Sequence, residues 1–299
     1  MKQKNVYTYL LTELENKLNI IPDKSDETPI NTLHSLWHLV SGTNLSHISA
    51  EKHELKELTE DQIKQLEKLI YKRLNNTPLA HITKRQHFLG LDFILKEGIY
   101  IPRKDTELVA KTAISVIKDY FFNSDNIKII DVCTGIGTLG IAIANQCINT
   151  QIYGSDIYAP AIELAQINSE QFRLLNRTNF YTGDLFEPFS KLGLEGKTQI
   201  IVSAPPYIST KKAKNLKEEI SNHEPIEAFD AGSFGLSIFT KLISESTTYM
   251  KNNGFLIFEC GSGQGDFLVK RLKLNPNYKN VKGICDNKNE IRVILAQKA

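Results

Sequence analysis

Residues 127–144, IKIIDVCTGIGTLGIAIA, decide the fold. The segment begins as an apolar run that closes at Asp131, passes through Gly135 and Gly137, and then becomes apolar again. A strand, a glycine loop and a helix in this order suit a ligand site, because glycine lets the backbone approach a ligand before the helix begins. The loop has neither the Gly-x-Gly-x-x-Gly spacing of dinucleotide-binding proteins nor the Gly-Lys-Ser/Thr of a P-loop. Taken alone, it predicts either a nucleotide-like ligand site or a plain strand–helix turn.

The same alternation continues on both sides of this segment, from residue 102 to the C-terminus. Short apolar runs alternate with helical stretches, which argues for βαβ units and a parallel sheet. The predicted strands are IKIIDV, QIYGSDI, NFYTGD, QIIVSA, GFLIFEC, VKGICD and IRVILA. We therefore expect residues 102–299 to form an α/β domain.

The N-terminal part has a different pattern, which is helical. Thr59 with Gln62 predicts a capping box, and apolar residues then repeat at helical spacing. Residues 81–101 contain alternating apolar and polar positions that suggest a hairpin. The expected organisation is a small helical domain over residues 1–80, a connecting hairpin over 81–101 and the α/β domain over 102–299.

Composition argues against several classes of protein. The chain has 299 residues with 36 Lys and Arg against 34 Asp and Glu, so its formal charge of +2 gives no strong attraction to nucleic acid or membranes. The first residues are basic and then apolar, but Glu13 and Glu15 interrupt them before a signal peptide or membrane span could form. A cytoplasmic location is expected. The four cysteines form no CxxC pair, which favours free thiols and no metal site.

Two further strands are followed by acidic residues. Asp156 comes about 20 residues after the glycines, at the place of the acid that accepts from ribose hydroxyls. Asp184, in YTGDLF, is either a helix cap or an acceptor for the amino group of a purine. Ligands bind at the carboxyl ends of parallel strands, so Asp131, the glycine loop, Asp156 and Asp184 describe a nucleoside pocket that does not grip phosphate. This favours S-adenosylmethionine over NAD or ATP.

A rigid turn follows the fourth strand of the predicted sheet, in QIIVSAPPYIST. Pro205 and Pro206 cannot donate to a sheet ladder, so the strand ends there, and Tyr207 follows. At this position the turn could hold a methyl acceptor beside the sulfonium of the cofactor.

The whole chain resembles the PrmC/HemK family, class I methyltransferases that methylate the glutamine side chain in the Gly-Gly-Gln loop of translation release factors. The resemblance is carried by PLAHITKRQHF, IPRKDTEL, DVCTGIGTLGIAIA, GDLFEPF, VSAPPYI, HEPIEAFDAGSFGL, FECGSGQG and IRVILA. It implies a Rossmann-like, mostly parallel sheet of seven strands and an N-terminal helical domain that contacts the release factor. It also implies S-adenosylmethionine as cofactor and a release factor as partner.

The resemblance also assigns roles to single positions. It implies that the cofactor is bound by Asp156 and by the loop residues Cys133, Thr134, Gly135, Ile136 and Gly137, with Leu185 beside the adenine. Ala204, Pro205, Pro206 and Tyr207 fall on the family's acceptor motif, Asn-Pro-Pro-Tyr. There the Asn oxygen and a proline carbonyl accept both hydrogens of the planar NH2 while the aromatic ring stacks on the amide. Position, rather than a strong base, then supplies much of the catalysis.

Four positions depart from the family pattern. Ala204 lacks the side-chain acceptor of the usual Asn, Cys133 and Lys84 stand where glycines are usual, and Lys104 replaces a second proline. An amide N–H left unpaired in a closed site costs about 1–3 kcal/mol. Three accounts stay open: an inactivating substitution, a shift to another acceptor such as a small metabolite or another protein, and a release-factor enzyme with reduced turnover. A binding protein that has lost catalysis is a further hypothesis, and the family activity is the leading interpretation.

Overall fold

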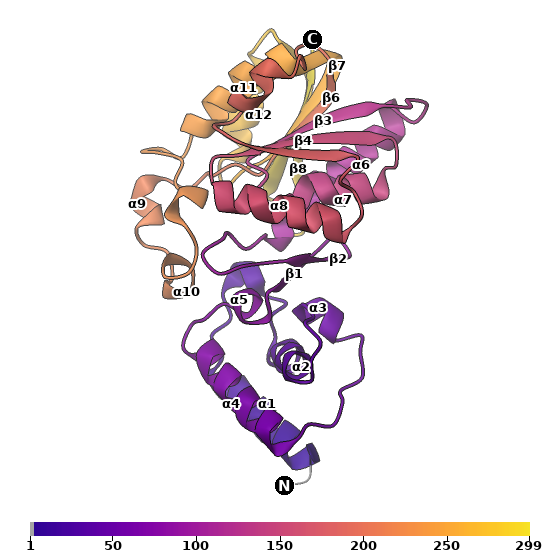
Figure 1. Ribbon diagram of the computed structural model, residues 1–299. Helices are drawn as coiled ribbons and strands as arrows, with labels where there is room; N and C mark the ends of the chain where they lie inside the picture. Colours follow the sequence, from indigo (N-terminus) through magenta and orange to yellow (C-terminus); the bar gives the residue numbers. More distant parts are fainter. Residues whose placement is uncertain (1–2) are drawn as a thin grey trace. The chain divides into compact units, whose positions relative to one another are not determined.

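The structure, a computed structural model, describes residues 3–299 and divides into two compact units (Figure 1). The helical unit comprises Met1–Lys104 and Leu216–Pro225, and the sheet unit comprises Asp105–Asn215 and Ile226–Ala299. Met1 and Lys2, which the sequence analysis assigns to the helical domain, lie outside the described residues.

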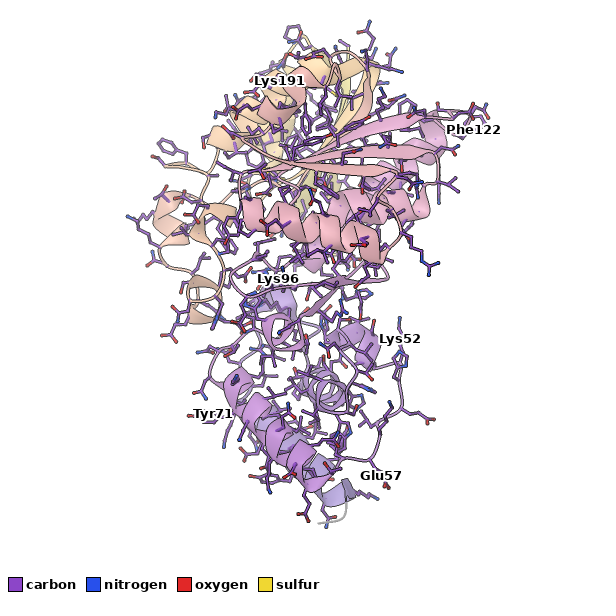
Figure 2. All side chains as sticks on the ribbon, in the orientation of Figure 1. Lys52, Glu57, Tyr71, Lys96, Phe122 and Lys191 are labelled. Atoms are coloured by element: carbon purple, nitrogen blue, oxygen red, sulfur yellow. The ribbon has the colours of Figure 1, made fainter. Side chains whose placement is uncertain are left out.

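The helical unit contains several helices that share one apolar core. Its helices are α1 (Gln3–Lys17), η1 (Pro22–Lys24), α2 (Pro29–Val40), α3 (His47–Ala50), α4 (Glu60–Leu74), α5 (Leu79–Thr83) and α10 (Glu218–Ser221). The predicted capping box begins α4: the Gln62 N–H donates to the Thr59 hydroxyl at 3.3 Å, and the Thr59 N–H donates to the Gln62 side chain at 2.9 Å. Trp37 is buried in the core, whereas Tyr71 projects outward from α4 (Figure 2).

A short hairpin completes the helical unit. β1 (Arg85–Phe88) pairs antiparallel with β2 (Leu91–Ile94), so the predicted hairpin is present. Lys84, directly before β1, has a left-handed φ of 56° at the end of α5. Glycine adopts this conformation without steric cost. The glycine that the family resemblance leads us to expect at this position would avoid that cost.

The sheet unit contains the predicted mostly parallel, seven-stranded sheet. Its strands are β3 (Ile127–Val132), β4 (Thr150–Asp156), β5 (Thr178–Thr182), β6 (Thr198–Ser203), β7 (Met250–Glu259), β8 (Tyr278–Cys285) and β9 (Ile291–Lys298). They lie in the order β5-β4-β3-β6-β7-β9-β8. β9 runs antiparallel to β7 and β8, and the other neighbouring strands run parallel. The α/β class I methyltransferase architecture expected from the sequence is confirmed.

Helices cover both faces of this sheet. α6 (Glu107–Tyr120), α7 (Thr138–Gln146) and α8 (Ala159–Gln171) lie on one side, and α11 (Ser237–Tyr249) and α12 (Gly265–Lys273) lie on the other (Figure 1). Short helical turns complete the element list: η2 (Lys104–Thr106), η3 (Glu187–Lys191), α9 (Thr210–Ala213) and η4 (Ile226–Ala228). Among residues 3–299, none of the helices combines the length and the apolar character that a membrane crossing requires.

The strand order creates a switch point between β3 and β6. From β3 the chain adds β4 and β5 toward one edge of the sheet, and then adds β6 and β7 toward the other. In open α/β sheets a crevice forms at the carboxyl ends of the strands where the direction changes, and ligands bind there. The predicted site residues follow β3, β4, β5 and β6, so the fold brings these segments to the same edge.

Candidate active site

The glycine loop after β3 contains alternate residues in the left-handed backbone conformation. Cys133, Gly135 and Gly137 have φ values of 59°, 55° and 83°. A Cβ on Gly137 would lie 2.8 Å from the Ile141 side chain and 3.0 Å from Phe180, so this position requires glycine for space as well as for conformation. A Cβ on Gly135 would meet nothing within 4 Å, which leaves open space above the loop.

Asp131, at the end of β3, has one committed oxygen and one unused oxygen. Oδ2 accepts from the Thr134 hydroxyl at 2.5 Å and from the Gly140 N–H at 3.0 Å. Oδ1 is buried and has no hydrogen-bond partner within the protein. Burial raises the pKa of Asp131 to about 7, although the bonds from Thr134 and Gly140 act in the opposite direction. The unused oxygen is a buried acceptor in need of a donor.

Asp156, at the end of β4, ties that strand to the glycine loop. Its Oδ2 accepts from the Gly135 N–H at 2.8 Å, and its Oδ1 accepts from the Tyr158 N–H at 2.9 Å. A carboxylate has about four acceptor sites, so both oxygens retain capacity for a ligand. Burial raises the pKa of Asp156, while these backbone donors lower it. The ribose contact stays a prediction that this geometry permits.

Asp184 and Leu185 follow β5 and face different surroundings. Asp184 forms a half-exposed ion pair with Lys241 of α11, with 2.9 Å between Oδ2 and Nζ. Leu185 is buried in the core, and its carbonyl accepts from the Ser155 hydroxyl at 2.5 Å. The predicted purine contact of Asp184 therefore competes with its pairing to Lys241.

The acceptor turn, residues 204–207, is held firmly on both sides of Ala204. Before it, the Ser203 hydroxyl donates to the Val132 carbonyl at 2.7 Å. After it, the Tyr207 hydroxyl donates to Glu259 at 3.2 Å, and the Gln264 side-chain amide donates to the Tyr207 carbonyl at 3.1 Å. Ala204 itself is half-buried and brings no polar side-chain atom to the turn.

Glu259, at the end of β7, is a site residue that the sequence analysis did not single out. The residue is 3% exposed, and its side chain accepts from the Thr106 hydroxyl at 2.6 Å as well as from Tyr207. Arg292 lies 3.6 Å away and also pairs with Asp105 at 3.2 Å. Burial raises the pKa of Glu259, and Thr106 and Arg292 counteract this. The sequence feature that could have identified Glu259 is an acidic residue at the carboxyl end of a predicted strand, within FECGSGQG.

Ile157, which directly follows Asp156, is a further candidate that the sequence analysis did not name. Its side chain is 67% exposed at the ligand edge of the sheet, beside Tyr158, which is 38% exposed. Exposed apolar side chains beside Asp156 are suited to packing against the face of a flat ring. The signal in the sequence was an apolar pair directly after the acid.

Comparisons with known proteins agree with this architecture. Residues 112–259 match the family model described as the methyltransferase small domain. The chain is 32% identical over 240 residues to the release factor glutamine methyltransferase of Clostridium acetobutylicum, covering 80% of this chain and 82% of that protein. It is 31% identical to the protein of the same name from Thermodesulfovibrio yellowstonii, covering 81% and 84%. It is 34% identical to the one from Buchnera aphidicola, covering 81% and 83%.

Solved structures confirm the fold. The hMettl16 catalytic domain in complex with an RNA hairpin superposes with a TM-score of 0.53 at 15% identity, covering 80% of this chain and 82% of that one. The human methyltransferase 10 domain containing protein gives a TM-score of 0.50 at 15% identity, covering 70% and 89%. At this identity the similarity concerns the fold alone.

The methyl donor of this enzyme class is S-adenosylmethionine, and the site fits its chemistry. The unpaired Asp131 Oδ1 is an acceptor for an amino group, and the space over Gly135 admits a ligand. The protein is accordingly a methyltransferase, and a shift to an unrelated acceptor is not favoured. The identity to curated relatives over 80% of the chain, with the sheet order and the site at its switch point, shows that the chain belongs to the family of release factor glutamine methyltransferases.

Proposed function

We propose that this protein transfers a methyl group from S-adenosylmethionine to the glutamine side-chain amide in the Gly-Gly-Gln loop of a peptide chain release factor. The observation that carries the proposal is the turn at residues 204–207, which lies at the end of β6, beside β3 and its glycine loop. Its aromatic residue is held by Glu259 and its backbone by Gln264. The relatives named above supply the substrate class.

The cofactor residues have separable roles in this proposal. When bound, S-adenosylmethionine supplies an electrophilic methyl group on a sulfonium. Asp131 accepts from the amino group through Oδ1, and Asp156 accepts from the ribose hydroxyls. Asp184, Leu185 and Ile157 surround the base. The floor of the cofactor site is formed by the backbone of the glycine loop, residues Cys133, Thr134, Gly135, Ile136 and Gly137.

The acceptor is placed by the turn. The Tyr207 ring stacks on the planar amide, and a carbonyl of the Pro205–Pro206 pair accepts one of its two hydrogens. The ring is fixed because its hydroxyl donates to buried Glu259. No base of high pKa is required, since an amide nitrogen held in line with the methyl group reacts largely through its position, and the N–H proton that the methylated amide releases passes by way of the hydrogen-bonded carbonyl to water.

Ala204 leaves the second amide hydrogen without a side-chain acceptor. An unpaired N–H in a closed site costs about 1–3 kcal/mol, and each 1.36 kcal/mol is a factor of ten in rate. We therefore propose an active enzyme whose turnover is lower than that of the same site with Asn. This fits a family scaffold that is otherwise complete at the turn.

The partner and the location follow from the substrate. The helical unit is proposed to contact the release factor, and the reaction takes place in the cytoplasm, where translation occurs. Direct binding of nucleic acid is not part of the proposal, because the net charge of +2 provides no phosphate-tracking field.

The test is methylation of a purified release factor with S-adenosylmethionine labelled on its methyl group. We expect the label on the glutamine of the Gly-Gly-Gln peptide, located by mass spectrometry of the digested product. The matched control substrate is the same release factor with that glutamine replaced by alanine, which should stay unlabelled. Label on other proteins or metabolites of a cell extract, with none on the release factor, would contradict the proposal.

A further inference from the structure

Ten residues from the middle of the sheet unit's sequence belong structurally to the helical unit. Leu216–Pro225 clusters with Met1–Lys104, while the chain on either side, ending at Asn215 and resuming at Ile226, belongs to the sheet unit. In Figure 1 this region is the orange stretch labelled α10, which follows α9 (Thr210–Ala213) in the chain. We call residues 208–230 the acceptor loop, because they directly follow Tyr207.

The base of the acceptor loop is fixed within the sheet unit. Ile208 forms a parallel bridge with Asp230: its N–H donates to the Phe229 carbonyl at 3.0 Å, and its carbonyl accepts from Ala231 at 2.8 Å. The Thr210 N–H donates to the Gly232 carbonyl at 3.0 Å. Both ends of the loop are therefore joined to each other immediately after the acceptor turn.

We call residues 216–225 the tip of the acceptor loop. The first residue that anchors this tip is Glu219 in α10, within the helical unit. Its two oxygens accept from Lys24 at 2.8 Å and from Arg73 at 2.9 Å. Arg73 also pairs with Glu27 at 2.9 Å. These four side chains are 4% exposed or less. Burial alone would raise the pKa of Glu219, but Lys24 and Arg73 lower it, so the carboxylate stays charged.

The second anchor is Glu224, two residues before the turn η4. It accepts from Arg103 at 2.7 Å and 3.1 Å and from the backbone N–H of Ile101 at 2.8 Å. Arg103 also donates to Asp23 at 2.7 Å. Desolvation acts against the charge of Arg103, but Glu224 and Asp23 raise its pKa well above the ordinary value. Lys24 Nζ also lies 3.9 Å from Glu224 Oε1, so the two anchors form one connected cluster of buried charges of both signs.

Charges buried in this way hold the tip in place. Leaving a buried charge without its partner is strongly unfavourable. Release of residues 216–225 would take both carboxylates from Lys24, and it would take one carboxylate each from Arg73 and Arg103. Buried ion pairs contribute little net stability compared with apolar packing but can specify one arrangement. The cluster is thus suited to set where the tip sits on the helical unit.

We propose that residues 216–225 are a latch through which the helical unit positions the acceptor loop, the segment that directly follows the turn assigned to the substrate glutamine. Glu219 and Glu224 are positioning residues: they act through the loop on the acceptor and leave cofactor binding unchanged. This inference rests on the proposed function, because it assigns the substrate to that turn.

The first test replaces Glu219 by Gln, with Glu218→Gln as the matched control. Glu218 is the preceding residue of α10, is exposed, and makes one side-chain bond to Asn76 at 3.3 Å. In Glu219→Gln we expect faster hydrogen exchange over residues 216–225 and faster tryptic cleavage at the exposed lysines of 211–217, with unchanged exchange in β3, β4 and β6. We also expect at least about a tenfold rise in KM for the release factor, with the affinity for S-adenosylmethionine unchanged by calorimetry.

A second variant keeps the cluster intact and lengthens its connection to the turn. Inserting a short Gly-Ser segment after Asn215 changes no contact of Glu219 or Glu224, and such insertions cost little stability. We expect parental exchange in residues 216–225, parental cofactor affinity, and kcat/KM for the release factor reduced by about tenfold. This insertion variant tests the latch even if the Glu219→Gln variant does not fold.

The outcomes are distinguishable from failure of the proposed function. A parent that does not methylate a release factor overturns the proposed function and this inference with it, while the exchange data still report the docking of the tip. A parent that does so, together with an insertion variant of unchanged kcat/KM, overturns the latch alone. Unchanged exchange of residues 216–225 in a folded Glu219→Gln variant would also overturn it.

Discussion

Replacing Ala204 by Asn is expected to raise the rate at which a release factor glutamine is methylated by at least about tenfold. The size of this increase follows from the contacts that hold the turn at residues 204–207. Ser203 donates a hydrogen bond to Val132 of β3 at 2.7 Å. Tyr207 donates to Glu259 at 3.2 Å, and its carbonyl accepts from Gln264 at 3.1 Å. The backbone around residue 204 is therefore already in place. The substitution adds one acceptor oxygen to a fixed frame.

The magnitude is that of one hydrogen bond in a closed site. Satisfying an amide N–H that otherwise lacks a partner recovers about 1–3 kcal/mol. Ordering the new side chain costs up to about 1 kcal/mol of rotamer entropy. The remainder centres on about 1.4 kcal/mol, which is a factor of ten in rate.

The assay compares kcat/KM for a Gly-Gly-Gln release factor under labelled S-adenosylmethionine, with cofactor affinity measured separately. Ala204→Leu is the matched control, because Leu is close to Asn in size and shape but has no acceptor atom. We expect no gain for Leu and unchanged cofactor affinity for both variants. A fall in activity with Asn, or an equal rise with Leu, would refute the assignment of the missing acceptor.

Three further predictions concern the cofactor site and the backbone. Asp156→Ala should weaken S-adenosylmethionine binding by at least about tenfold in calorimetry, because the ribose hydroxyls lose their acceptor, and parental affinity would remove the ribose assignment. Asp131 has a pKa of about 7, so its affinity for the cationic amino group should increase as pH rises through about 7, and Asp131→Asn should abolish this trend. Lys84→Gly should stabilise the protein by about 0.5–1 kcal/mol in urea unfolding, because an exposed non-glycine residue holds φ 56° there, whereas Lys84→Ala should bring no gain.

Much of the sheet unit could be predicted because its signals are local. Each buried strand is a short apolar run, and the residue that follows it necessarily lies at the carboxyl edge of a parallel sheet. Asp131, the glycines, Asp156 and the Pro-Pro-Tyr turn could therefore be assigned to one edge before any coordinates were known. The capping box of α4 was predictable for the same reason, since its two bonds join residues three apart.

Glu259 and the anchors of the latch could not be found in this way. Glu259 acts on Tyr207, which is 52 residues away in the chain, and Arg73 pairs with Glu219 across 146 residues. An acidic residue in a polar stretch such as KEEISNHEP normally faces solvent, and no local pattern distinguishes one that is buried against an arginine. Only tertiary structure shows which of these carboxylates are 3% exposed and which are open to water.

The latch also changes how the helical unit should be understood. Ranges of 1–80, 81–101 and 102–299 treat substrate recognition and chemistry as consecutive segments that could be separated by cutting the chain. Residues 216–225 cross that division, since their buried carboxylates pair with Lys24, Arg73 and Arg103.

A chain that lacked its first 104 residues would keep the glycine loop, Asp131 and Asp156, and hence the residues assigned to cofactor binding. It would also expose the carboxylates of Glu219 and Glu224, whose cations would be removed, on the loop that directly follows the acceptor turn. Loss of methylation in such a fragment would therefore reflect a displaced acceptor loop as much as a missing contact with the release factor, which is why insertion after Asn215 is the cleaner separation of the two effects.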